Sequence, residues 1–116
     1  MSKVSIYGIK NCSTMKKASV WLEEHNIEFQ FHDYKKLGID EHSLRKWLKK
    51  VPWDELINRR GTTWRKLPEE AKQDIDNDKA VQLMLENTSL IKRPVLVIDD
   101  ALYLGFKDEI YQTIFN

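Results

Sequence analysis

The sequence predicts an α/β fold in which a β-α-β unit and a β-β-α unit enclose a helical middle section. Residues 4–32 show a short apolar run, then apolar residues at helical spacing, and then an alternation of apolar and polar residues. Residues 95–115 show two short apolar runs separated by two aspartates, followed by helical spacing. Between these regions the apolar residues recur at helical spacing, so the strands are expected to come from the two ends of the chain.

The amino-terminal region predicts two parallel strands joined by a helix. Residues 4–7 are rich in β-branched and aromatic side chains and lead into a glycine, as a short strand does. A helix is expected over residues 12–24, which puts Cys12 in its first turn. Residues 27–32 alternate, so they predict a strand with one buried face. A helix between two strands packs back onto their sheet, which makes the crossover right-handed and the strands parallel.

The rest of the chain predicts several helices, a β-hairpin and a final helix. In the middle section, helical elements are expected over residues 40–51, 53–57, 69–75 and 80–85, with a loop over residues 58–63. Val95–Ile98 is an unbroken apolar run, typical of a strand that is covered on both faces. Asp99-Asp100 predicts a turn, and Ala101–Leu104 the partner strand. Residues 107–115 then predict a helix.

Length and composition indicate one domain, over residues 1–116. The chain has 116 residues, 41% of them hydrophobic and 32% charged, which is enough apolar material for a core and excludes an intrinsically disordered protein. Nineteen Lys and Arg against eighteen Asp and Glu leave a formal charge of +1. Because no strong field of either sign results, we expect neither a nucleic acid nor a membrane as partner. A monomer is the expected state.

The single cysteine limits the chemistry and the compartment. One cysteine excludes an intramolecular disulfide, a cysteine-rich zinc site and an iron-sulfur cluster. The three histidines, His25, His32 and His42, fit no short zinc motif, so no metal site is expected. A free thiol favours a reducing compartment, and neither a secretory signal nor a membrane-spanning apolar run is evident. We therefore expect a cytoplasmic protein.

Cys12 is the candidate reactive residue. The unpaired N–H groups and the positive dipole end at a helix start stabilise a thiolate over a thiol. Lys10, Lys16 and Lys17 are close in sequence and add positive charge that would lower the pKa of the thiol further. Free cysteine is also among the most buried residue types, so an inert packing role is the alternative. Position alone leaves both interpretations open.

Several segments, in the same order along the chain, resemble those of a known protein family and together span almost the whole sequence. They are Tyr7-Gly8-Ile9-Lys10-Asn11-Cys12, Lys16-Lys17-Ala18, Trp21-Leu22, Arg60-Gly61-Thr62-Thr63-Trp64-Arg65-Lys66-Leu67, Ile91-Lys92-Arg93-Pro94-Val95 and Gly105-Phe106. In these segments the chain resembles the arsenate reductase-like (ArsC/Spx) family, and within it most closely the YffB-type proteins. The resemblance implies a thioredoxin-like fold with a mixed sheet and a helical insertion over approximately residues 38–90.

The resemblance also assigns roles to individual residues. It implies that Cys12 is the nucleophile, that Arg65 and Arg93 bind an oxyanion or a thiol adduct, and that Pro94 is a cis-proline beside the site. Lys10 and Asn11, directly before the cysteine, are the remaining candidate binding residues for substrate or glutathione. A guanidinium can hold an oxyanion or carboxylate through two parallel hydrogen bonds, and a thiolate attacks sulfur or arsenic.

Two departures from the family pattern shape the expected function. Met15 stands where an internal dithiol would place a second cysteine, so an external thiol must resolve any adduct. Lys107 stands near the place of the third arginine of arsenate reductases, and it lacks the planar fork of a guanidinium. We expect a glutathione-dependent thiol reductase with no bound cofactor, glutathione as co-substrate and glutaredoxin as a further candidate partner. The alternatives are an Spx-like regulator of transcription that binds RNA polymerase, and an arsenate reductase.

Overall fold

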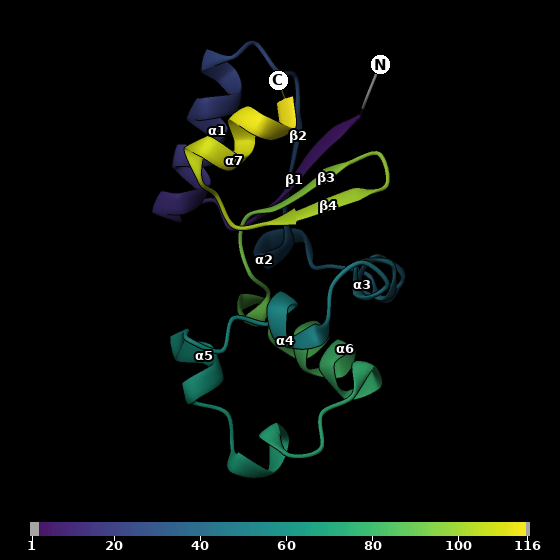
Figure 1. Ribbon diagram of the computed structural model, residues 1–116. Helices are drawn as coiled ribbons and strands as arrows, with labels where there is room; N and C mark the ends of the chain where they lie inside the picture. Colours follow the sequence, from purple (N-terminus) through teal and green to yellow (C-terminus); the bar gives the residue numbers. More distant parts are fainter. Residues whose placement is uncertain (1–2, 116) are drawn as a thin grey trace. The chain divides into compact units, whose positions relative to one another are not determined.

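The computed structural model describes residues 3–115 and is shown in Figure 1. The chain divides into two compact units. One comprises residues 1–36 and 93–116 and contains the sheet, and the other comprises residues 37–92 and is almost entirely helical. The helical insertion expected over approximately residues 38–90 falls in the second unit.

The sheet has four strands in the order β2-β1-β3-β4. The strands are β1 (Val4–Gly8), β2 (Gln30–Asp33), β3 (Val95–Ile98) and β4 (Ala101–Leu104). β1 pairs in parallel with β2 and antiparallel with β3, and β3 forms a hairpin with β4. The mixed sheet and the order β-α-β, helices, β-β-α confirm the predicted fold class.

Two helices of the first unit pack with the sheet around one apolar core. They are α1 (Ser13–Glu24) and α7 (Asp108–Phe115), which lie next to each other in Figure 1. The buried residues of α1 recur every three or four positions, so they lie on the one face of the helix that covers the sheet. The buried residues of this core are Val4, Ile6, Met15, Ala18, Trp21, Leu22, Leu96 and Tyr111.

Gly8 ends β1 and faces the side chain of Met15 in the first turn of α1. A Cβ atom at this position would overlap the sulfur of Met15, and Met15 is itself only 2% exposed. The absence of a side chain therefore lets the first turn of α1 approach the end of β1. This approach fixes where Cys12, one residue before the helix, is placed.

The second strand differs from its prediction. The prediction of a strand over residues 27–32 is wrong for Ile27 to Phe29, because the chain there closes α1: Asn26 has φ 57°, and Ile27 N–H donates to Leu22 O at 2.9 Å. This is the hydrogen-bond pattern of a Schellman motif. Phe31, predicted to face a core, is 40% exposed because β2 is an edge strand that pairs only with β1.

The second unit contains four α-helices and two 3₁₀ helices. The structure also contains the short helix α2 (Tyr34–Leu37), at the junction of the two units. The elements of the second unit are α3 (Glu41–Leu48), α4 (Trp53–Leu56), α5 (Thr62–Arg65), η1 (Glu69–Lys72), α6 (Asn77–Glu86) and η2 (Thr88–Leu90). Asp40 caps α3 by accepting from Ser43 N–H at 3.1 Å, and Asp76 caps α6 by accepting from Lys79 N–H at 2.8 Å.

Two further boundaries and one burial prediction differ from the structure. The predicted loop over residues 58–63 ends early because α5 begins at Thr62, after Gly61 in extended conformation. The predicted helix over residues 69–75 ends at Lys72, since Asp74 has φ 51° and leaves the helical path. The end of β3 is only half-buried, so the expectation of cover on both faces is wrong for Val97 and Ile98.

His25 and His32 stack on aromatic rings, whereas His42 is exposed. His25 Nδ1 lies 2.8 Å from Trp21 O, and its ring stacks on the Trp21 indole at 3.8 Å. His32 stacks on Tyr7 at 4.4 Å. Within residues 3–115 no group of three or more His, Cys, Asp or Glu side chains is arranged to hold a metal ion. In the same range no helix is both long and apolar enough to cross a membrane.

Candidate active site

Three chain segments meet at one edge of the sheet. In the register of the sheet, Tyr7 pairs with His32 on one side and with Val95 on the other. The carboxyl ends of β1 and β2 therefore lie at the same edge as the amino end of β3. Cys12 follows β1, Tyr34 directly follows β2, and Arg93 comes two residues before β3. The topology brings these three side chains together.

Cys12 is the residue that begins α1. It has φ −117° and ψ 129°, and its carbonyl accepts the first helical hydrogen bond from Lys16 N–H at 3.0 Å. The sulfur is partly buried and makes no fully formed capping hydrogen bond. The N–H groups of Met15 and Thr14 nevertheless interact with it, as expected for a group at a helix start.

The surroundings of the sulfur favour a thiolate. Burial raises the pKa of the Cys12 thiol, but four favourable contributions outweigh it. In decreasing order they are the Met15 N–H, a hydrogen bond from Arg93, the Thr14 N–H and the positive charge of Arg93. The pKa of Cys12 is consequently held below its ordinary value. Since the thiolate is the nucleophilic form, the site is suited to attack on sulfur.

Arg93 connects Cys12 to a buried tyrosine. Its guanidinium hydrogen-bonds to the sulfur of Cys12 and to the phenol of Tyr34. Partial burial lowers the pKa of Arg93, but the hydrogen bonds to Tyr34 and Cys12 outweigh this and raise it, so the group stays a cation. Tyr34 is only 1% exposed, and its burial raises the pKa to about 12 even though Arg93 opposes the rise. Tyr34 is therefore a neutral phenol beside the Arg93 cation.

The structure places the residues predicted for the site in three different locations. Arg93 contacts Cys12, and Pro94, which follows Arg93, is buried and has a cis peptide bond, as the resemblance implied. Lys10 and Asn11 are exposed in the turn that leads to Cys12. Arg65 is the last residue of α5, exposed, and belongs to the second unit. Its role in the site rests on the resemblance.

The sequence did not identify Tyr34 as a site residue, and it pointed to the wrong side chains as the positive charge that acts on Cys12. The sequence drew attention to Lys10, Lys16 and Lys17, whereas the side chain that lowers the pKa of Cys12 is Arg93. Tyr34 was not identified at all. A signal for it did exist, because a large aromatic residue directly after a strand parallel to β1 lies at the same sheet edge as Cys12.

Comparisons with known proteins place these residues in a family context. Residues 7–114 match the model of the ArsC family. The chain is 49% identical to a protein named YFFB, whose solved structure agrees with a TM-score of 0.92 over 96% of this chain and 97% of that chain. An arsenate reductase (ArsC) related protein from Brucella melitensis is 54% identical, with a TM-score of 0.78 over 98% and 95% of the two chains. The global transcriptional regulator Spx of Listeria innocua is 27% identical over 111 residues, which are 91% of this chain and 82% of Spx.

Proposed function

The chain belongs to the ArsC family, and from this we propose that it is a glutathione-dependent thiol reductase with Cys12 as its nucleophile. The observation that carries the proposal is the contact between Arg93 and the sulfur of Cys12 at the start of α1, which favours the thiolate. Cys12 is the only cysteine of the chain, so the adduct it forms requires a thiol from outside.

The first step is attack of the Cys12 thiolate on a mixed disulfide. The thiolate forms a bond to the glutathione sulfur of the substrate, the substrate's sulfur–sulfur bond breaks, and the second thiol leaves as a thiolate that takes a proton from solvent. Arg93 is placed to hold the attacking sulfur in its ionised form and then to bind a carboxylate of the glutathione adduct. The phenol of Tyr34 interacts with the same guanidinium of Arg93 and helps to position it.

The second step restores the enzyme. A glutathione thiolate attacks the glutathione sulfur bound to Cys12, which releases oxidised glutathione and the Cys12 thiolate. The same groups that lower the pKa of Cys12 make it a good leaving group in this step. We assign Lys10, Asn11, Arg65 and the backbone at Pro94 to the binding of glutathione, on the basis of the family resemblance.

The proposal is tested by turnover of hydroxyethyl disulfide with glutathione, coupled to a reductase of oxidised glutathione. We expect turnover by the native protein, none above background by Cys12→Ser, and a mass increase of one glutathione on Cys12 when the protein meets oxidised glutathione. A Cys12→Ser protein with full activity would overturn the proposal. The circular dichroism of both proteins controls for folding.

A regulator of transcription that binds RNA polymerase is the second candidate function. The observation that favours it is the 27% identity to Spx over 91% of this chain. The absence of a cysteine pair removes an internal redox switch, but docking on a protein surface does not require a thiol. Surface plasmon resonance with purified RNA polymerase, on native and Cys12→Ser protein, would show binding independent of the thiol if this function applies.

Reduction of arsenate is the third candidate. Lys107, near the place of the third arginine of arsenate reductases, is an exposed point charge just before α7 and cannot hold an oxyanion through a planar fork. We therefore propose arsenate only as a poor substrate. In the presence of glutathione and glutaredoxin, we expect arsenate reduction to be only slightly faster with the native protein than with Cys12→Ser.

A further inference from the structure

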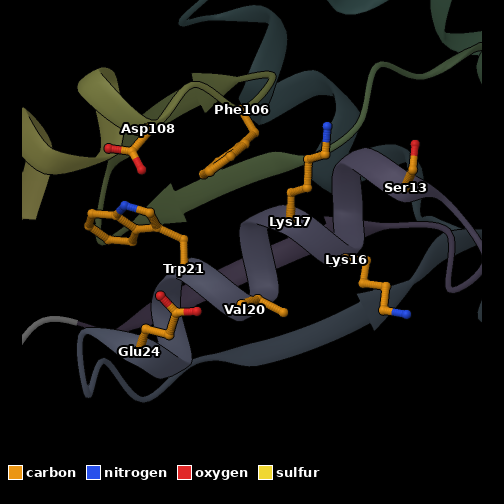
Figure 2. A pocket seen from close by; sticks show the side chains of 8 residues that line it. All are labelled: Ser13, Lys16, Lys17, Val20, Trp21, Glu24, Phe106 and Asp108. Carbon is orange, nitrogen blue, oxygen red and sulfur yellow. The ribbon is translucent and has the colours of Figure 1, made fainter.

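A groove that begins at Ser13 is separate from the residues assigned to the candidate active site. It has a volume of about 490 Å³ and runs along α1 opposite the start of α7 (Figure 2). From Ser13 to Glu24, eleven residue steps at 1.5 Å give it a length of about 16 Å. Volumes of this size are typical of sites for small organic ligands. Its lining residues are Ser13, Lys16, Lys17, Val20, Trp21, Glu24, Phe106 and Asp108.

The groove begins one residue after Cys12 in the chain, at Ser13. Cys12 and Phe106 both pack against the same apolar core of the first unit. Arg93 and Pro94 are not among its lining residues. A disulfide that reaches Cys12 can therefore place one half near Arg93 and extend the other half along this groove.

The lining has an apolar middle and charges of opposite sign at its two ends. Lys16 and Lys17 lie toward the end with Ser13, and Glu24 and Asp108 toward the other end (Figure 2). The side chains between them are apolar: the indole of Trp21, the ring of Phe106, and Val20, which is 41% exposed. Burial of the exposed Val20 side chain by a ligand in the same groove as the two aromatic rings would be favourable.

We propose that this groove binds the leaving half of the mixed disulfide, and that it selects small organic thiols with a carboxylate near the sulfur and an aromatic group beyond it. The inference rests on the proposed reductase function and adds the substrate class. Lys16 and Lys17 match a carboxylate close to the scissile bond, and the acidic far end disfavours a second anion there. The aromatic group covers Val20 and contacts Trp21 and Phe106.

The chemistry balances with glutathione as the reductant. The mixed disulfide and one glutathione give the free organic thiol and oxidised glutathione. Cys12 first takes the glutathionyl group and releases the organic thiolate from the groove, and a second glutathione then removes that group from Cys12. The groove contributes only to the first step, where the organic half is still bound.

Two matched disulfides test the substrate class. Both join glutathione to an N-acylated cysteine, which carries its carboxylate near the sulfur, and they differ in an acetyl or a benzoyl group. We expect kcat/KM to be about tenfold higher for the benzoyl compound, from partial burial of one phenyl ring. Val20→Glu should bring the ratio of the two values close to one, because a carboxylate would replace the apolar contact.

Ile110→Glu is the matched control. Ile110 is also a β-branched helical residue, is 47% exposed, and lies two positions after Asp108, about 200° around α7 from the groove. It should leave the ratio of the two kcat/KM values as in the native protein. Equal kcat/KM for the two compounds in the native protein would overturn the groove assignment and leave the reductase function standing.

A second readout separates the groove from the reaction. In Cys12→Ser protein, which cannot form the adduct, N-benzoylcysteine should shift the indole N–H resonance of Trp21, and N-acetylcysteine should not. If neither disulfide is turned over, the proposed reductase function is wrong. The Trp21 resonance then tests independently whether the groove binds the aromatic thiol. A shift specific to the benzoyl compound supports binding in the groove, and no shift overturns it.

Discussion

The guanidinium of Arg93 hydrogen-bonds to the sulfur of Cys12, which begins α1. Arg93 reaches this position because β3 runs antiparallel to β1, so that residues just before β3 meet residues just after β1. On its other side the same guanidinium contacts the buried phenol of Tyr34. A cation held between two partners lowers the pKa of the thiol without an internal second cysteine.

Tyr34 and Tyr111 are a matched pair for measuring how much the contact between the Tyr34 hydroxyl and Arg93 contributes to the free energy of unfolding. Both are essentially fully buried, but the Tyr111 hydroxyl has no hydrogen-bond partner within the described residues. Tyr34→Phe should lower the free energy of unfolding by about 1 kcal/mol, because Arg93 loses an acceptor. Tyr111→Phe should leave it unchanged or raise it by about 1 kcal/mol, because a buried unsatisfied group is removed. Urea denaturation measures both, and equal losses would contradict this account.

Gly8→Ala tests the close approach of α1 to β1. The new methyl group would overlap the buried Met15 side chain, so we expect the free energy of unfolding to fall by about 1–3 kcal/mol. In the double variant Gly8→Ala/Met15→Ala, the two losses should not add, since truncating Met15 makes room for the methyl group. Strict additivity in urea denaturation would show that the two residues do not compete for this space.

The lowered pKa of Cys12 predicts a pH dependence of stability. The folded protein lowers the pKa of the Cys12 thiol relative to its ordinary value, so the contribution of the thiolate is fully present above the unfolded pKa and is lost as the pH falls through the folded pKa. The difference in unfolding free energy between native protein and Cys12→Ala should therefore grow with rising pH and level off above about pH 9. Urea titrations under reducing conditions measure it, and a difference that falls with rising pH has the wrong sign for this account.

Arg65→Ala tests the one proposed site residue that lies in the second unit. We expect the KM for glutathione to rise about tenfold, with a smaller change in kcat, because a charged contact made alike in ground and transition states is lost. Arg45→Ala is the control, because Arg45 is in the same unit and pairs with Glu41 on the surface. Equal KM values for the Arg65→Ala and Arg45→Ala proteins would remove Arg65 from the glutathione site.

Local patterns were enough to predict the elements that hold the site. The strand at residues 4–7, the helix after Cys12 and the hairpin after Pro94 follow from short-range periodicity and turn residues. The β-α-β order then fixed a parallel pair. Cys12 at a helix start was correctly predicted for the same reason.

Features that depend on distant parts of the chain were not predicted. The exposure of Phe31 follows from the edge position of β2, which the alternation of its residues does not reveal. The contacts of Arg93 with Cys12 and Tyr34 depend on the register of three strands, so nearby lysines in the sequence drew attention instead. The strand predicted from Ile27 begins only at Gln30 because α1 closes at Asn26, a local signal that competed with strand propensity.

The most direct test of the central claim is the rate of alkylation of Cys12 as a function of pH, with intact mass confirming modification of this single thiol. We predict a midpoint well below the value of about 8.5 for a free cysteine, raised in Arg93→Ala and much less affected in Lys16→Ala. A midpoint at or above 8.5 with slow labelling, or equal shifts in the two variants, would contradict an Arg93-stabilised thiolate and make Cys12 a packing residue.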